Sequence, residues 1–146
     1  MKILVDADSC PRPAREIVLR SSARTGIKAL FAANRPIPGI TGELMELCPP
    51  GEGSADDRIV ELARPGDLVL TRDIPLAERL VEQGVRVLDD RGRTYSKENI
   101  RELRSIRDFM VGLAKNSLGT ERTANYGKRE IKAFADSFDR EVRKLS

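Results

Sequence analysis

The chain has no histidine among its 146 residues. This absence excludes Ser-His-Asp and Cys-His catalytic pairs, histidine-ligated zinc sites and a histidine general base. The two cysteines, Cys10 and Cys48, are too few for a disulfide scaffold. No stretch combines the charged start, apolar run and small-residue cleavage site of a signal peptide. We therefore expect a reduced, cytoplasmic protein.

Long apolar runs and aromatic residues are also scarce. The longest apolar runs have the length of a strand, far below the roughly 20 residues that span a bilayer, so no membrane segment is expected. Aromatic residues make up 4% of the chain and tryptophan is absent. If the protein binds nucleic acid, contacts to the backbone are therefore favoured over base stacking.

Positive and negative charges are unevenly distributed along the sequence. Residues 1–90 hold 12 Lys and Arg against 15 Asp and Glu, a net charge of −3, whereas residues 91–146 hold 14 against 8, a net charge of +6. An acidic metal site beside a basic surface for phosphates is typical of enzymes that act on nucleic acid. Ordinary surface helices rich in Lys and Arg produce the same asymmetry, so both interpretations stay open.

Short apolar runs alternate with amphipathic segments over the first 90 residues. Strands are predicted at 2–5, 27–33, 68–70 and 85–88, and residues 44–48 form either a strand or part of a helix. Helices are predicted from 11 to 26, 54 to 63 and 75 to 83, with a Pro- and Gly-rich loop at 34–42. Continuously apolar strands predict a parallel sheet covered on both faces, so the fold class is α/β.

The last third of the chain is predicted to be helical. Apolar residues at helical spacing mark one long helix from about residue 96 and a second that includes residues 131–145. The polar segment 117–127 between them is expected to be an exposed loop. A length of 146 residues fits a single domain, so residues 1–146 should share one core.

Acidic residues stand where strands and loops end. Asp6 and Asp8 follow the first apolar run, Asp56 and Asp57 open a predicted helix, and Asp73 follows the run 68–70. Open α/β sheets bind their ligands at this edge. Carboxylates gathered there repel one another unless a cation neutralises them, and without histidine the expected ion is Mg²⁺ or Mn²⁺ held through oxygen.

Each acid also has a plain structural alternative. In an extended segment Asp6 and Asp8 would share a face about 7 Å apart, but Asp8 can instead cap a helix. Ser54 and Asp57 resemble a capping box, and Asp73 can cap the helix that follows it. Adjacent helical positions diverge by about 100°, so at most one of Asp56 and Asp57 is expected to bind the ion.

Several basic residues lie on the two C-terminal helices and are candidates for binding nucleic-acid phosphates. Local pairing with neighbouring glutamates is the alternative role. These candidates are Lys97, Arg101, Arg104, Arg129 and Lys132.

Several segments together resemble the YaiI/YqxD family of bacterial proteins. They are VDADSCP, AAN at 32–34, GSADDRIVELARPGDLVLTRDIPLA at 53–77, RGRTYSKENI at 91–100, RDFM at 107–110 and KREIKAFADSFDR near the end. The family's sheet and acidic cluster resemble the PIN domain superfamily, a Rossmann-like fold whose active members are metal-dependent ribonucleases. This resemblance implies a PIN-like domain in which Asp6, Asp56 or Asp57, and Asp73 match the acidic positions.

The resulting hypothesis is a nuclease that hydrolyses phosphodiesters of RNA with Mg²⁺ or Mn²⁺. Asp6 and Asp73 would hold the ion, Asp56 or Asp57 would complete its site, and Asp8 would orient the attacking water. One alternative is a phosphatase that uses Asp6 and Asp8 as nucleophile and acid-base. Another is a catalytically silent module that binds nucleic acid or protein.

Overall fold

Six strands form one sheet in the computed structural model, which describes residues 1–51, 53–116 and 126–145. Their order is β3-β2-β1-β4-β5-β6. The first five pair in parallel, and β6 pairs antiparallel with β5. The strands are β1 (Lys2–Asp6), β2 (Lys28–Ala33), β3 (Met45–Leu47), β4 (Leu68–Leu70), β5 (Arg86–Leu88) and β6 (Thr94–Tyr95). The predicted α/β class with a mostly parallel sheet is confirmed.

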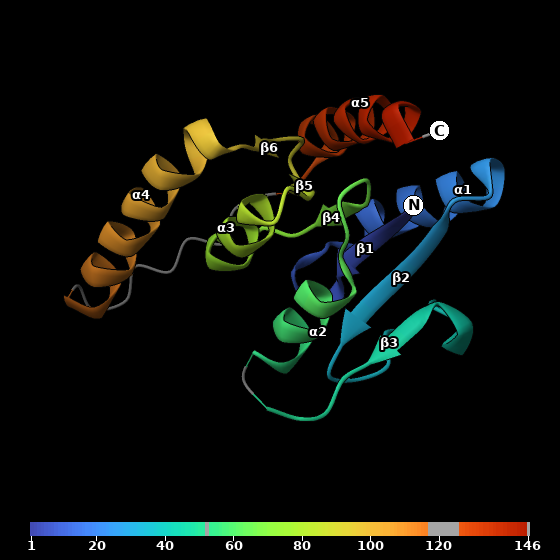
Figure 1. The fold of residues 1–146 in the computed structure, drawn as a ribbon, viewed down its shortest axis with the longest axis horizontal. Coiled ribbons are helices and arrows are strands. Elements are labelled where there is room, and N and C mark those ends of the chain that lie inside the picture. Colours follow the sequence, from blue (N-terminus) through green and yellow to red (C-terminus); the bar gives the residue numbers. More distant parts are fainter. Residues whose placement is uncertain (52, 117–125, 146) are drawn as a thin grey trace.

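Helices cover both faces of this sheet (Figure 1). Two helices, α1 and α5, pack on one face, whereas α2 and α3 pack on the other, and α4 lies outside α3. The helices are α1 (Arg12–Thr25), α2 (Ser54–Leu62), α3 (Ile74–Glu82), α4 (Lys97–Asn116) and α5 (Lys128–Leu145). None of the helices among the described residues is long and apolar enough to cross a membrane.

The two cores follow from the period of two in a strand. In β1, Ile3 and Val5 belong to the core under α1 and α5, whereas Leu4 belongs to the core under α2 and α3. Both faces are buried, which explains why the strands read as continuous apolar runs. On the α5 side, the rings of Phe134 and Phe138 stack with centroids 5.4 Å apart.

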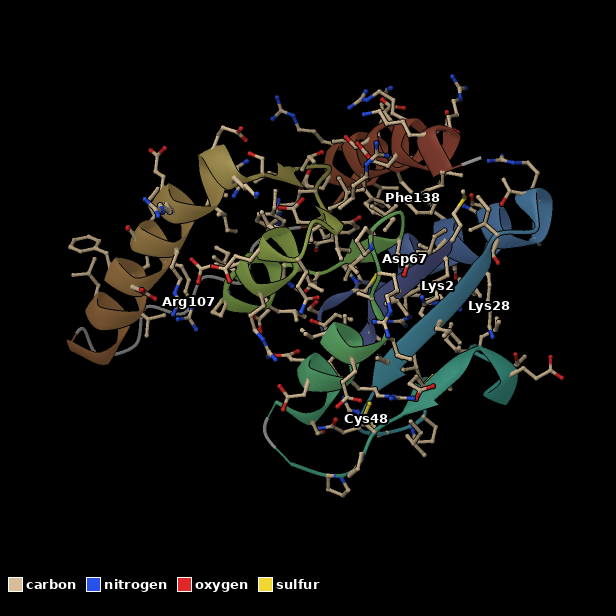
Figure 2. The ribbon with its side chains drawn as sticks, in the orientation of Figure 1. Lys2, Lys28, Cys48, Asp67, Arg107 and Phe138 are labelled. Carbon is tan, nitrogen blue, oxygen red and sulfur yellow. The ribbon has the colours of Figure 1, made fainter. Side chains whose placement is uncertain are left out.

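β1 is central and pairs with β2 on one side and β4 on the other. Its start is fixed by Asp67, a buried residue that precedes β4 (Figure 2). The Asp67 carboxylate accepts hydrogen bonds from the backbone N–H of Lys2 at 3.0 Å and from its ammonium at 2.7 Å. Burial opposes ionisation of Asp67, but the bonds from Lys2 and Arg64 outweigh it, so the pKa of this carboxyl is lowered.

The confirmed predictions do not cover three segments: residues 44–48, β6 and the loop 117–127. Residues 44–48, left open as strand or helix, contain the end of a 3-10 turn (Gly42–Leu44) and then β3. β6 was not predicted, because two residues carry no periodicity to detect. Of the predicted loop 117–127, residues 117–125 lie outside the described part of the chain.

Candidate active site

The sheet presents a hollow of about 430 Å³ at the carboxyl ends of its central strands. Strand order reverses at β1, whose neighbour on one side is β2 and on the other β4, and such a switch leaves a crevice outside the strand ends. The first and fourth strands are therefore direct neighbours. Four of the predicted acids line this hollow: Asp6, Asp8, Asp56 and Asp73.

Asp6 ends β1 and is the most buried of these acids, with 6% of its surface exposed. Its Oδ2 accepts hydrogen bonds from the hydroxyls of Thr71 at 2.8 Å and Ser9 at 3.0 Å. Its Oδ1 accepts none from the described residues. Burial raises the pKa of Asp6, with further increases from the charges of Asp73 and Asp8, although the two hydroxyl bonds oppose them. One hydrogen-bonded oxygen and one without such a partner make Asp6 the best-oriented candidate ligand.

Asp73 stands three residues after β4 and caps α3. Its Oδ1 accepts a 3.1 Å bond from the backbone N–H of Leu76, so the capping role considered for it is confirmed. Its own N–H donates to the Thr71 hydroxyl at 3.0 Å. Thr71 therefore links the acid that ends β1 to the acid three residues after β4. Because Asp73 also lines the hollow, capping and a place in the site are compatible here.

Asp56 and Asp57 separate at the start of α2. Asp56 faces the hollow, and burial, with the charges of Asp73 and Asp6, raises its pKa to about 6 despite the opposing charge of Arg79. Asp57 is exposed and pairs with Arg79 at 2.9 Å. The capping box expected from Ser54 and Asp57 is wrong. Gly53 is the N-cap, and the Ser54 hydroxyl instead donates to the carbonyl of Pro49 at 2.6 Å.

Asp8 is exposed and belongs to a 3-10 turn, Ala7–Ser9, instead of an extended segment. The i, i+2 argument that placed Asp6 and Asp8 on one strand face therefore fails, yet the turn still brings Asp8 to the hollow. Its alternative role as a helix cap is also wrong, because the N-cap of α1 is Pro11.

The donor set at the hollow consists of carboxylate and hydroxyl oxygens, which suit a hard cation. Within residues 1–51, 53–116 and 126–145, however, no three acidic or cysteine side chains are close enough to enclose an ion. Mg²⁺ commonly keeps several waters and is held by one or two carboxylates, so a closed cage is not required. The raised pKa values of Asp6 and Asp56 indicate carboxylates whose charges are poorly compensated, which fits a cation at this place.

The predicted phosphate-binding residues are spread over two helices. Lys97, Arg101 and Arg129 are exposed. Arg104 pairs with Glu78 of α3 at 2.7 Å and with Asp108, and Lys132 pairs with Asp136 at 2.9 Å. None of the five lines the hollow. Their role in binding nucleic acid stays a prediction.

Sequence reasoning did not assign a role at the site to several side chains found there. Thr71 and Ser9 bond Asp6, whereas Asn34 lines the hollow with its Oδ1 3.0 Å from the Ser54 hydroxyl oxygen. Two arginines, Arg72 and Arg107, also line it. A detectable signal existed for Ser9, Thr71 and Arg72, because they lie within three residues of the carboxyl ends of β1 and β4. None existed for Arg107, which reaches the hollow from a helix distant in the sequence.

Comparison with known proteins gives consistent matches over the whole fold. A sequence model of the "Uncharacterized BCR, YaiI/YqxD family" matches residues 4–144. A "UPF0178 protein" of Treponema pallidum is 47% identical, with 99% of this chain and 83% of the relative covered. Others from Treponema denticola and Syntrophobacter fumaroxidans are 44% and 42% identical, covering 95% and 99% of this chain and 90% and 95% of the relatives. No solved structure matches significantly.

Proposed function

Since the chain belongs to the uncharacterised YaiI/YqxD family, we propose its function from the chemistry of the hollow: a Mg²⁺- or Mn²⁺-dependent nuclease that hydrolyses RNA phosphodiesters. The observation that carries the proposal is Asp6, a buried carboxylate at the switch point of the sheet. Hydroxyl donors hold one of its oxygens, while the other accepts no hydrogen bond from the described residues.

Each acid would have its own role in binding the ion or the attacking water. Asp6 and Asp73 would hold the ion, and Asp56, in place of Asp57, would complete its surroundings. A divalent ion in such a site lowers the pKa of bound water and neutralises charge on the transferring phosphoryl group. Asp8, exposed at the mouth, would orient the attacking water. Binding of the ion would lower the pKa of Asp56, which burial and the neighbouring acids raise to about 6 in the metal-free protein.

A second candidate is a catalytically silent module that binds nucleic acid or protein. The observation that favours it is that no three acids among the described residues gather closely enough to enclose an ion. The two proposals differ in whether covalent bonds are broken, so one assay separates them.

The test is hydrolysis of an end-labelled single-stranded RNA with Mg²⁺, with Mn²⁺ and with EDTA. We expect cleavage with either metal and none with EDTA. Asp6→Asn and Asp73→Asn should each abolish it, whereas Asp57→Asn should retain it, because Asp57 pairs with Arg79 outside the hollow. Cleavage that persists in Asp6→Asn would reject the proposed site, and RNA binding without any cleavage would favour the silent module.

A further inference from the structure

The hollow poses an electrostatic problem for a phosphodiester substrate. Four carboxylates line it, and before an ion neutralises them they repel a polyanion. Among the described residues, the cationic side chains that line the same hollow are Arg72 and Arg107. They come from different elements: Arg72 directly follows the Thr71 that bonds Asp6, and Arg107 lies on α4.

Arg72 is held in place by a hydrogen bond across the mouth of the hollow. Its Nε donates to the backbone carbonyl of Ser9 at 3.0 Å, which joins the loop after β4 to the turn after β1. The residue as a whole is exposed. The Nε bond restrains the guanidinium beside the hollow, and the charge of Arg72 also acts on Asp90, where it opposes the burial that raises the pKa of that carboxyl.

Arg107 reaches the hollow from α4, on the side of that helix that faces α3 (Figure 2). α4 is attached to the domain through the buried Ile100 and through Arg104, which pairs with Glu78 of α3 at 2.7 Å. The Arg107 side chain is 43% exposed, and its terminal nitrogen donates to neighbouring Asp108 at 3.1 Å. This contact joins two exposed groups and is therefore weak, so it leaves Arg107 available to an anionic ligand.

Building on the proposed function, we propose that Arg72 and Arg107 bind phosphates of a single-stranded RNA on two sides of the acidic hollow and so position the scissile phosphate over Asp6 and Asp73. A guanidinium presents paired N–H donors that match two phosphate oxygens, which a lysine does not reproduce. Arg72 supplies a contact at the sheet edge, where its Nε is bonded to the Ser9 carbonyl. Arg107 supplies a contact from a separate helix, so the RNA strand runs between α4 and the carboxyl ends of β1 and β4.

The test is fluorescence anisotropy with a labelled single-stranded oligouridylate, measured over a salt series in an Asp6→Asn background, where hydrolysis is not expected. Arg72→Ala and Arg107→Ala should each weaken binding about tenfold, the loss of a charge-assisted phosphate contact. Each should also flatten the slope of log K against log salt by about 0.7. Arg72→Lys and Arg107→Lys should restore the salt slope but not the full affinity. Thermal unfolding checks that all variants are folded.

Arg24→Ala is the matched control. Arg24 is an exposed arginine in the last turn of α1, and it does not line the hollow. The strand that follows α1 starts at the amino ends of the central strands, opposite the hollow. Its removal should leave both affinity and salt slope unchanged. Equal losses in Arg24→Ala and Arg107→Ala would mean non-specific attraction and would overturn the proposal, as would unchanged binding in the Arg72 and Arg107 variants.

Hydrolysis, measured separately with Asp6 intact, distinguishes failure of this inference from failure of the proposed function. Cleavage that depends on Asp6 but not on Arg72 or Arg107 would reject the proposed arginine sites and agree with the proposed nuclease activity. RNA binding that depends on both arginines, without any cleavage, would agree with the proposed RNA site and reject the proposed nuclease activity.

Discussion

The hydroxyl of Thr71 donates a 2.8 Å hydrogen bond to Oδ2 of Asp6 from a position 65 residues further along the chain. The same hydroxyl oxygen accepts the backbone N–H of Asp73. One buried threonine thus forms hydrogen bonds with two of the acids in the hollow, so its removal should change the hydrogen bonding of both.

Thr71→Val should destabilise the fold by about 1–3 kcal/mol, because it leaves buried polar groups without a partner. It should also raise the pKa of Asp6 further, since one of the two hydroxyl bonds that oppose the increase is lost. Thr71→Ser keeps the hydroxyl and should recover most of the stability. Urea unfolding of the three proteins measures this. Equal stability of the valine and wild-type proteins would show that the bond contributes nothing.

Adding Mg²⁺ or Mn²⁺ should raise the melting temperature, because an ion that binds only the folded state stabilises it by mass action. Asp6→Asn should remove most of this increase. Without metal, the same variant should be at least as stable as the wild type, since a buried charge close to other carboxylates has gone. Asp57→Asn, which removes an exposed carboxylate, is the control. A full metal response in Asp6→Asn would place the ion elsewhere.

Asp56 should make stability depend on pH between about 4 and 6. Its folded pKa of about 6 lies above the ordinary value of 3.8, so the folded state holds the proton over a range in which the unfolded state has lost it. Stability without metal should therefore fall as pH rises through this window. Asp56→Asn should reduce this dependence and raise stability at pH 7. Chemical unfolding at several pH values tests the sign, which would be reversed if the folded pKa were depressed.

Removing Arg101 should flatten the salt dependence of RNA binding by about 0.7 units of slope if this exposed residue contacts a phosphate. Arg104→Ala should behave differently, because Arg104 pairs with Glu78 and helps to hold α4 against α3. We expect a loss of stability in Arg104→Ala and none in Arg101→Ala. The double variant should bind with the flatter slope, and an unchanged slope would make these arginines ordinary helix surface.

Gly92→Ala should destabilise the protein more than Gly84→Ala. Both glycines have positive φ, 89° and 80°, so an alanine is strained at either position. At Gly92 a Cβ would also lie 2.6 Å from the carbonyl oxygen of Ala133 in α5, whereas at Gly84 it would meet nothing within 4 Å. The difference in unfolding free energy between the two variants isolates the clash from the backbone strain. Equal losses would show that α5 shifts without cost.

The sequence predicted β1, β2, β4 and β5 of the parallel sheet, because each is a short apolar run bounded by turn residues. It left β3 open, because Met45 and Leu47 are separated by the charged Glu46. It also identified acids that the fold gathers, since Asp6 directly ends a strand and Asp73 follows one closely. It could not separate Asp56 from Asp57, because the choice depends on how α2 is rotated against β1 and on the tertiary ion pair between Asp57 and Arg79.

Contacts between residues far apart in the sequence could not be predicted either. Arg104 looks like a surface residue in the sequence, and its partner Glu78 is 26 residues earlier on another helix. Arg107 approaches the hollow only because α4 docks on α3. β6 forms because the Asp89 carboxylate accepts the backbone N–H groups of Arg91 and Arg93 and shapes the turn before it. No periodic pattern reports contacts of these kinds.

The central place of β1 also has a consequence for the order of folding. β1 lies far before β4 in the sequence, yet one of its two edges pairs with β4, which starts at Leu68. Closing so long a loop is entropically costly, so this pairing should form later than the local contact of β1 with β2. Asp6 gains its Thr71 partner only at that step. The nascent chain would therefore carry its acidic residues without the geometry that makes them a site, and any activity should appear only with the final docking of β4.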